Sequence, residues 1–107
     1  YNRVSAAYKR PKDDPDRVAA VDDALLGAAA VPLAVAGLAA RVRRLAIEIG
    51  RIGNKNARSD AVVAGALAGA AITGAVENVR VNVQSLSDPA RGRDLVAQAE
   101  ALAADLS

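Results

Sequence analysis

The segment Gly53-Asn54-Lys55-Asn56-Ala57-Arg58-Ser59-Asp60 is followed by sixteen small or apolar residues, AVVAGALAGAAITGAV, from Ala61 to Val76. Gly65, Gly69 and Gly74 lie among the alanines of this run. Such small side chains let a neighbouring backbone approach more closely than the roughly 8–10 Å that usually separates helix axes. The segment therefore predicts a turn followed by a central helix with closely packed neighbours.

The residues before this segment also predict helices. Residues 1–9 are typical of the end of one helix, and a second is expected to begin near Asp14, with Pro15 at its first helical position. Its apolar residues recur at intervals of three and four as far as Ile52. Pro32 lies inside this run and predicts a kink or break in the turn before it.

The residues after the turn complete the predicted fold. A third helix is expected over about residues 58–86, starting at Arg58 or Ser59, and a fourth is expected to open at Asp88 and Pro89. No stretch shows the alternation of apolar and polar residues that is typical of a half-buried strand. We therefore expect an all-α fold, an antiparallel helical bundle with long helices, one of them kinked near Pro32.

Composition limits the core and the chemistry. In 107 residues there is no Phe, Trp, Met, Cys or His, so the core consists of Ala, Val, Leu and Ile. A core this thin is expected to pack against another segment or a second subunit. Without cysteine and histidine, thiolate chemistry, the commonest metal ligand and the commonest general base are all excluded from these residues.

Charge and hydropathy bear on partners. A net charge of +2 is too small to indicate nucleic-acid binding, and Tyr1 and Tyr8 are too few to form a stacking surface for bases. The apolar run is shorter than the roughly 20 residues of a membrane-spanning helix, so a buried helix is the preferred interpretation over a membrane span. The sequence shows no export signal, and we expect a cytoplasmic protein that binds neither nucleic acid nor membrane.

Four separated motifs together resemble a known family. In chain order they are Arg10-Pro11-Lys12, Ala29-Ala30-Val31-Pro32-Leu33, the turn from Gly53 to Asp60, and the segment with Asn78 and Asn82. Over residues 1–88 the sequence resembles the cyclodeaminase/cyclohydrolase family of folate one-carbon enzymes. That family includes the C-terminal domain of formiminotransferase-cyclodeaminase and bacterial methenyltetrahydrofolate cyclohydrolases.

The resemblance implies an activity and an organisation. These enzymes close 5-formiminotetrahydrofolate to 5,10-methenyltetrahydrofolate with loss of ammonia, or interconvert the methenyl form and 10-formyltetrahydrofolate with water. It implies no metal and no cofactor beyond the tetrahydrofolate substrate. It also implies that residues 1–107 are the C-terminal part of one helical domain, which packs with an N-terminal glycine-rich part of the same protein and forms a homodimer. The alternative is a catalytically silent helical module for dimerisation or interaction, and the choice between cyclodeaminase and cyclohydrolase stays open.

Either reaction needs a group that moves a proton, and the candidates are Asp60 and Lys12. Asp60 follows Ser59 at the expected start of the central helix, and the pair matches a Ser-Asp element of the family. Helix capping is the competing interpretation of Asp60. Lys12 and Arg10 flank the rigid Pro11 and match the family in that turn, where solvated charges are the competing interpretation.

Four asparagines complete the predicted site. Asn54 and Asn56 match a Gly-Asn-x-Asn element of the family and would bind pterin edges or a catalytic water, although asparagine in a turn often bonds locally or takes a left-handed conformation. Asn78 and Asn82 share one helix face, as do residues four apart in general. Their alternatives are hydrogen bonds to another helix and contact with a ligand.

Overall fold

Two long helices that run in opposite directions form the body of the molecule. In the computed structural model, which describes residues 2–106, these are α2 (Arg17–Ile52) and α3 (Lys55–Gln84). The other elements are α1 (Asn2–Tyr8), a 3-10 turn, η1 (Pro89–Gly92), and α4 (Arg93–Ala104). The expected all-α class is confirmed, since residues 2–106 contain no strand.

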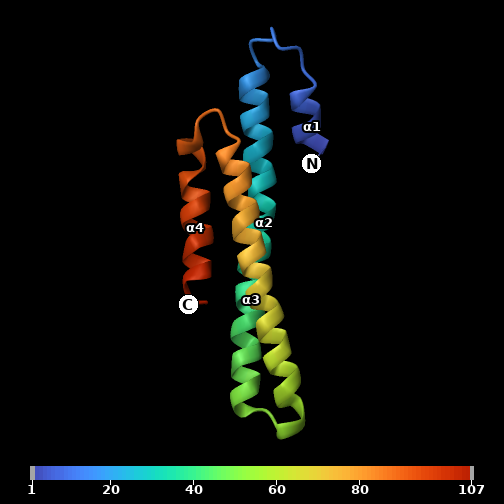
Figure 1. Cartoon of the computed structure of the whole chain (residues 1–107), viewed down its shortest axis with the longest axis vertical. Helices are drawn as coiled ribbons and strands as arrows, with labels where there is room; N and C mark the ends of the chain where they lie inside the picture. Colours follow the sequence, from blue (N-terminus) through green and yellow to red (C-terminus); the bar gives the residue numbers. More distant parts are fainter. Residues whose placement is uncertain (1, 107) are drawn as a thin grey trace.

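The molecule is a rod measuring 64 × 23 × 13 Å. Figure 1 shows α1 and α4 beside the half of the α2–α3 hairpin that lies away from its turn. Within the described part of the chain, the half near the turn therefore consists of two helices alone. Tyr1, which was expected to belong to the first helix, lies outside the described residues.

The helix starts differ from those expected because side chains satisfy the backbone at other positions. α2 begins at Arg17 rather than near Asp14, whose side chain instead accepts a hydrogen bond of 2.9 Å from the N–H of Asp16 and holds a separate turn. α3 begins at Lys55 rather than at residue 58 or 59, because Asn54 accepts a hydrogen bond of 3.0 Å from the N–H of Ala57.

Two further expectations concern prolines. α2 continues without a break through Pro32, so a break there is wrong and any kink is minor. The predicted opening at Asp88 and Pro89 is confirmed: Asp88 accepts a hydrogen bond of 3.1 Å from the N–H of Ala90, and Pro89 starts η1, which leads into α4.

Alanines form most of the contact between the two long helices. The ideal Cβ position at Gly65 lies 3.8 Å from the Cβ of Ala46, and that at Gly50 lies 3.8 Å from the Cβ of Ala61. Of the three glycines expected at close helix contacts, Gly65 alone faces α2. An added Cβ at Gly69 would meet only Leu106, at 3.6 Å, and one at Gly74 would meet nothing within 4 Å. Beside α4, larger side chains fill the core, and the most deeply buried are Ile72, Val76 and Val79.

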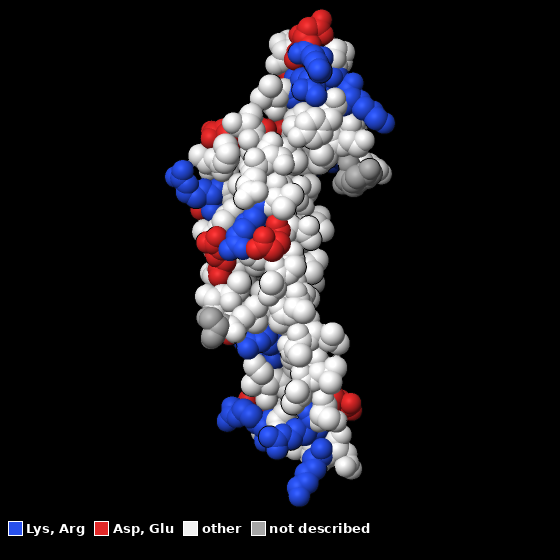
Figure 2. Space-filling view, in the orientation of Figure 1, with Lys and Arg blue, Asp and Glu red and all other residues white. Residues whose placement is uncertain are grey.

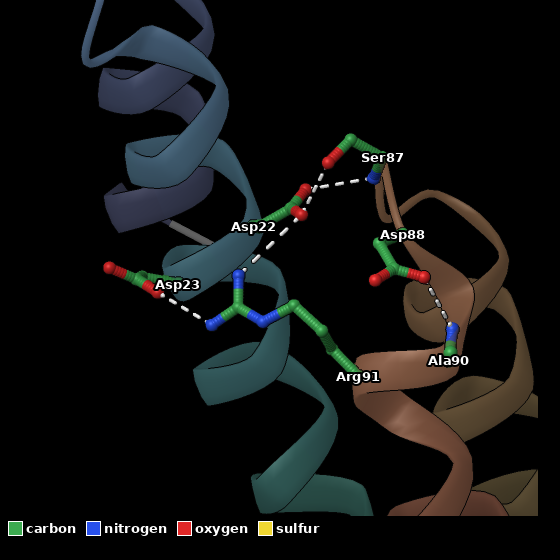
Figure 3. A network of polar contacts seen from close by, with 6 residues as sticks. All are labelled: Asp22, Asp23, Ser87, Asp88, Ala90 and Arg91. Atoms are coloured by element: carbon green, nitrogen blue, oxygen red, sulfur yellow. Dashed lines mark hydrogen bonds and ion pairs between the residues drawn. The ribbon is translucent and has the colours of Figure 1, made fainter.

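A polar cluster around the buried Asp22 joins the loop after α3 to the first half of α2 (Figure 3). Asp22 is only 3% exposed and accepts hydrogen bonds from the N–H and the hydroxyl of Ser87 at 2.9 and 2.6 Å. Arg91 lies 3.6 Å from Asp22 and 3.2 Å from Asp23. The Arg91 side chain is 44% exposed, so it contacts both carboxylates from the solvent side.

Candidate functional site

The structure places the predicted site residues in three separate regions. Arg10 and Lys12 lie in the turn between α1 and α2, whereas Asp60 lies near the α2–α3 turn at the opposite end of the rod (Figure 1). Asn78 and Asn82 lie between these ends, on α3. Because the rod is 64 Å long, one chain does not bring Lys12 and Asp60 together.

At the α1–α2 turn, Arg10 is engaged within the chain. Its guanidinium lies 2.8 Å from the carboxylate of Asp14. The N–H of Asp16, followed by Arg10, holds the pKa of Asp14 below its ordinary value. Lys12 is exposed and forms no ion pair with the described residues. Lys12 is thus the free cation of this motif.

At the α2–α3 turn, Asn54 has a structural task. Its backbone is extended, with φ −73° and ψ 166°, so of the two local alternatives the hydrogen bond is confirmed and the left-handed conformation is wrong. Its side-chain oxygen caps α3, which leaves the amide NH₂ group for a ligand. Gly53 is required for space rather than for a positive φ, since a Cβ there would lie 2.6 Å from the carbonyl oxygen of Ile49. Asn56 is exposed in the first turn of α3.

Asp60 does not cap α3, so the interpretation of Asp60 as a helix cap is wrong. Because the helix begins at Lys55, both Ser59 and Asp60 lie beyond the first four N–H groups, which are the ones left free at a helix start. Ser59 and Asp60 are exposed. Asp60 lines a pocket of 320 Å³ between the two long helices, whose other walls are apolar. These walls are Val42, Leu45, Ala46, Ile49, Ala57, Ala61 and Ala64.

Asn78 and Asn82 line a second pocket, of 560 Å³, further along the same side of the hairpin. Asn82 donates a hydrogen bond of 2.9 Å to the backbone carbonyl of Asn78, within α3. The expected bonds to another helix are absent from the described residues because this face of α3 is open, not buried. The side-chain oxygen of Asn82 stays available as an acceptor. The remaining walls are small or apolar: Ala28, Val31, Pro32, Val35, Ala71, Gly74 and Ala75.

A larger groove of 620 Å³ lies on the other side of the same helix contact. Its basic residues are Arg43, Arg51 and Arg58, and Arg43 donates a hydrogen bond of 3.3 Å to the carbonyl of Asp105. Figure 2 shows basic side chains gathered toward the end of the rod that carries the α2–α3 turn. None of the predicted asparagines lines this groove, so its size alone does not make it the site.

An apolar row on α2 is exposed, although an apolar face of this helix was expected to be buried. Here the row is called the α2 seam, and it consists of Val31, Val35, Leu38, Val42, Leu45, Ile49 and Ile52. Several of these residues were assigned to the expected apolar face of the helix, yet Leu45 is 63% exposed and Ile52 is 74% exposed. The sequence shows that these apolar residues recur at intervals of three and four. It does not show whether another helix covers them.

Two further observations concern metal binding and membrane insertion. Residues 2–106 contain no group of three acidic side chains placed to hold a metal ion. Both long helices contain a window long and apolar enough to cross a membrane, with 28% of each window buried in the structure. Core helices of soluble proteins share that property, so length and composition do not distinguish the two cases.

Comparison with known proteins identifies the family. Residues 1–101 match the sequence profile described as formiminotransferase-cyclodeaminase. The chain belongs to the formiminotransferase-cyclodeaminase family. It is 38% identical over 88 residues to the formimidoyltransferase-cyclodeaminase of Sus scrofa, covering 78% of this chain and 16% of that protein.

A bacterial relative matches nearly the whole chain. The methenyltetrahydrofolate cyclohydrolase of Methylorubrum extorquens is 35% identical over 109 residues, which cover 98% of this chain. The chain spans 52% of the length of that protein. All eight candidate site residues lie inside the segment that matches the family profile, residues 1–101.

Proposed function

We propose that this chain is the C-terminal part of a folate one-carbon enzyme that forms or hydrolyses 5,10-methenyltetrahydrofolate. The observation that carries the proposal is the match to a methenyltetrahydrofolate cyclohydrolase along 98% of the chain. The family match over residues 1–101 agrees with it. A silent interaction module has no comparable support.

The pockets on one side of the α2–α3 hairpin suit a flat heterocycle with polar edges. The Asn78 pocket offers apolar walls for the ring faces and amide groups for the ring edges. Asn54 and Asn56 offer further amide groups near the turn, and Ser59 adds a hydroxyl. The substrate-binding residues of this proposal are Asn54, Asn56, Ser59, Asn78 and Asn82, together with Arg10 in the α1–α2 turn.

Asp60 is the proposed proton carrier. In hydrolysis, its carboxylate would accept a proton from the water that attacks the methenyl carbon, and it would return a proton to the ring nitrogen that leaves. In ring closure of the formimino compound, the carboxylate would accept the proton of N10 as that nitrogen attacks the formimino carbon, and it would pass this proton to the departing ammonia. Two observations support this role: Asp60 lines the pocket, and its carboxylate makes no hydrogen bond or ion pair with the described residues.

Lys12 is the second catalytic candidate, with Arg10 beside it as a binding residue. Its distance from Asp60 argues for a different task, such as binding the carboxylates of the substrate's glutamate tail. A Lys12→Met variant would then show a raised KM with an unchanged kcat, whereas a fall in kcat would assign Lys12 to proton transfer.

The proposal includes an assembly. It places an N-terminal glycine-rich part of the same protein and a second subunit beside this hairpin, in a cytoplasmic enzyme that needs no cofactor beyond the tetrahydrofolate substrate. The alanine-rich core and the exposed α2 seam support the need for additional packing.

The direct test follows the absorbance of methenyltetrahydrofolate with the intact protein. One reaction starts from 5,10-methenyltetrahydrofolate and the other from 5-formiminotetrahydrofolate. Catalysis of either reaction above the uncatalysed rate would support the proposal and would name the activity. A folded protein that accelerates neither reaction would overturn it.

A further inference from the structure

Pro32 lies inside α2, where it leaves one backbone acceptor without its usual donor. In a regular helix the N–H of each residue donates to the carbonyl four positions earlier, and proline has no N–H. Because α2 continues without a break through Pro32, the carbonyl of Ala28 lacks the bond that residue 32 would donate. No backbone N–H outside α2 donates to it in the described chain. This oxygen, called here the Ala28 carbonyl, is therefore open to a group outside the helix.

The Ala28 carbonyl belongs to the pocket of 560 Å³ that holds Asn78 and Asn82. Ala28 and Pro32 both line this pocket. A helix carbonyl points along the axis toward the residue four positions later, so the oxygen lies between these two wall residues. The pocket wall on α2 thus carries a polar atom among its small and apolar side chains.

The register of the two long helices sets the Ala28 carbonyl at the level of the asparagines. Gly65 packs against Ala46, and the equivalent contact four residues further along α2, at Gly50, lies four residues back along α3. Continued toward α1, this antiparallel register places the two asparagines beside residues 33 and 29 of α2. The Ala28 carbonyl points from residue 28 toward residue 32 and therefore lies within the same stretch.

Two acceptors are thus available on opposite walls of the pocket. One is the Ala28 carbonyl on α2, and the other is the side-chain oxygen of Asn82 on α3, whose NH₂ group donates to the backbone carbonyl of Asn78. The side-chain amide of Asn78 forms no hydrogen bond with the described residues and offers both a donor and an acceptor. A ligand for this pocket therefore needs a group with two donors, set at the edge of a flat apolar body.

We propose that the Ala28 carbonyl and Asn82 together bind the 2-amino group of the pterin ring, and that Pro32 determines this specificity by freeing the carbonyl. The inference rests on the folate substrate of the proposed function. An amino group on an aromatic ring carries two N–H donors that point apart in the ring plane, so it fits between acceptors on opposite walls. Beside them Gly74 leaves room for the ring, since an added Cβ there would meet nothing within 4 Å. Pro32 is a positioning residue, because it acts through the carbonyl of Ala28.

Stability distinguishes this role of Pro32 from a structural one. Proline is the least favourable residue in a helix interior, and Pro32→Ala restores the missing N–H, so the variant should melt about 5 °C or more above the wild type. A proline required for the fold would give the opposite change. A Pro32→Ala variant that melts below the wild type would assign Pro32 to the fold and would overturn the inference.

Ligand binding tests the specificity. Calorimetric titrations of the intact protein without oxygen would compare tetrahydrofolate with its 2-desamino-2-methyl analogue, in which a methyl group replaces the amino group. The wild type should prefer tetrahydrofolate. In Pro32→Ala the new N–H takes up the Ala28 carbonyl, and the preference should fall by about 3- to 10-fold, the effect of one hydrogen bond between neutral groups. An unchanged preference would overturn the inference.

Two controls separate the missing N–H from the shape of the proline ring. Lactic acid at position 32, introduced by translation in vitro, has the side chain of alanine but an ester oxygen in place of the N–H. This variant should keep the wild-type preference, and a preference like that of Pro32→Ala would overturn the inference. Val35→Ala trims the same pocket without changing the backbone of α2. It should weaken both ligands by a similar factor, and a lost preference would show that wall volume decides the choice, contrary to the inference.

The same titrations keep this inference distinct from the proposed function. If the wild type prefers tetrahydrofolate as described and yet catalyses neither reaction, the proposed function fails and the recognition of the amino group stands. If the protein catalyses one reaction, but the preference does not depend on an N–H at position 32, the function stands and the inference fails. A wild type that binds neither folate would overturn both.

Discussion

Asp22 and Ser87 are 65 residues apart in the chain, yet the carboxylate of Asp22 accepts hydrogen bonds from both the N–H and the hydroxyl of Ser87. This contact fixes the loop after α3 to α2 and sets the direction in which α4 returns along the hairpin (Figure 3). Because Asp22 is buried, its charge depends on these partners and on Arg91.

Removing the Asp22 carboxylate should destabilise the fold. Asp22→Ala removes both hydrogen bonds that Ser87 donates to this buried carboxylate, and hydrogen bonds to a charged group are typically worth about 1.5–3 kcal/mol in the free energy of unfolding. Asp23→Ala is the matched control: its exposed ion pair with Arg91 is worth at most about 1 kcal/mol. Urea denaturation measures both variants, and equal effects would contradict the role given to Asp22.

The same carboxylate predicts a pH dependence. Burial opposes the charge on Asp22, but the hydrogen bonds from Ser87 and the charge of Arg91 outweigh it and hold the pKa of Asp22 below its ordinary value of 3.8. A lowered pKa in the folded state stabilises the protein fully above the ordinary value, and this contribution is lost as the pH falls through the folded pKa. Melting temperatures between pH 6 and pH 3 should therefore fall more steeply for the wild type than for Asp22→Asn. Parallel curves would show that Asp22 does not titrate differently in the two states.

Gly92 should be intolerant of a side chain. A Cβ at this position would lie 2.6 Å from one methyl of Val83 and 2.7 Å from the other, so Gly92→Ala forces the packing of α4 apart. We expect a loss of about 1–3 kcal/mol, as for other overpacked sites. Gly37→Ala is the control, because an added Cβ there meets nothing within 4 Å, and removing a mid-helix glycine should stabilise α2 by about 0.5–1 kcal/mol. Thermal denaturation that gave both variants the same sign would contradict this packing.

Alanine variants of Asn54 and Asn56 should affect different properties, the first the stability of the protein and the second its activity. Asn54→Ala removes the cap of α3 and should cost about 1 kcal/mol of stability. Asn56→Ala breaks no hydrogen bond found among the described residues and should leave the unfolding transition in place while raising KM. Denaturation and steady-state kinetics of both variants check this, and a destabilised Asn56→Ala would assign that residue to the fold.

The fold class could be predicted from the sequence because it depends on the period of the apolar residues and on turn residues. Helix starts depend on which side chain takes the cap, and the sequence offered several candidates around Asn54 and Ser59. Asn54 is the cap because its side-chain oxygen accepts a hydrogen bond from the N–H of Ala57. Ser59 and Asp60 then fell inside the helix, where the cap interpretation no longer applies.

The candidate site was harder to predict, since it depends on packing. Asn78 and Asn82 do share a face, as their spacing requires, but only the structure shows that this face is open. Nothing in the order of residues placed Asp22 against Ser87, because that contact joins distant segments. An acidic residue beside Val21 and Leu25, on the apolar side of a helix, was the available signal.

The central claim is that Asp60 moves the proton in a folate one-carbon reaction, and turnover of an Asp60→Asn variant of the intact protein tests it most directly. Because Asp60 lies outside the cap of α3, the variant should melt at the wild-type temperature. With methenyltetrahydrofolate or formiminotetrahydrofolate as substrate, kcat should fall by about 10² or more, the contribution typical of a general acid or base. Wild-type kcat in the folded variant would contradict the claim.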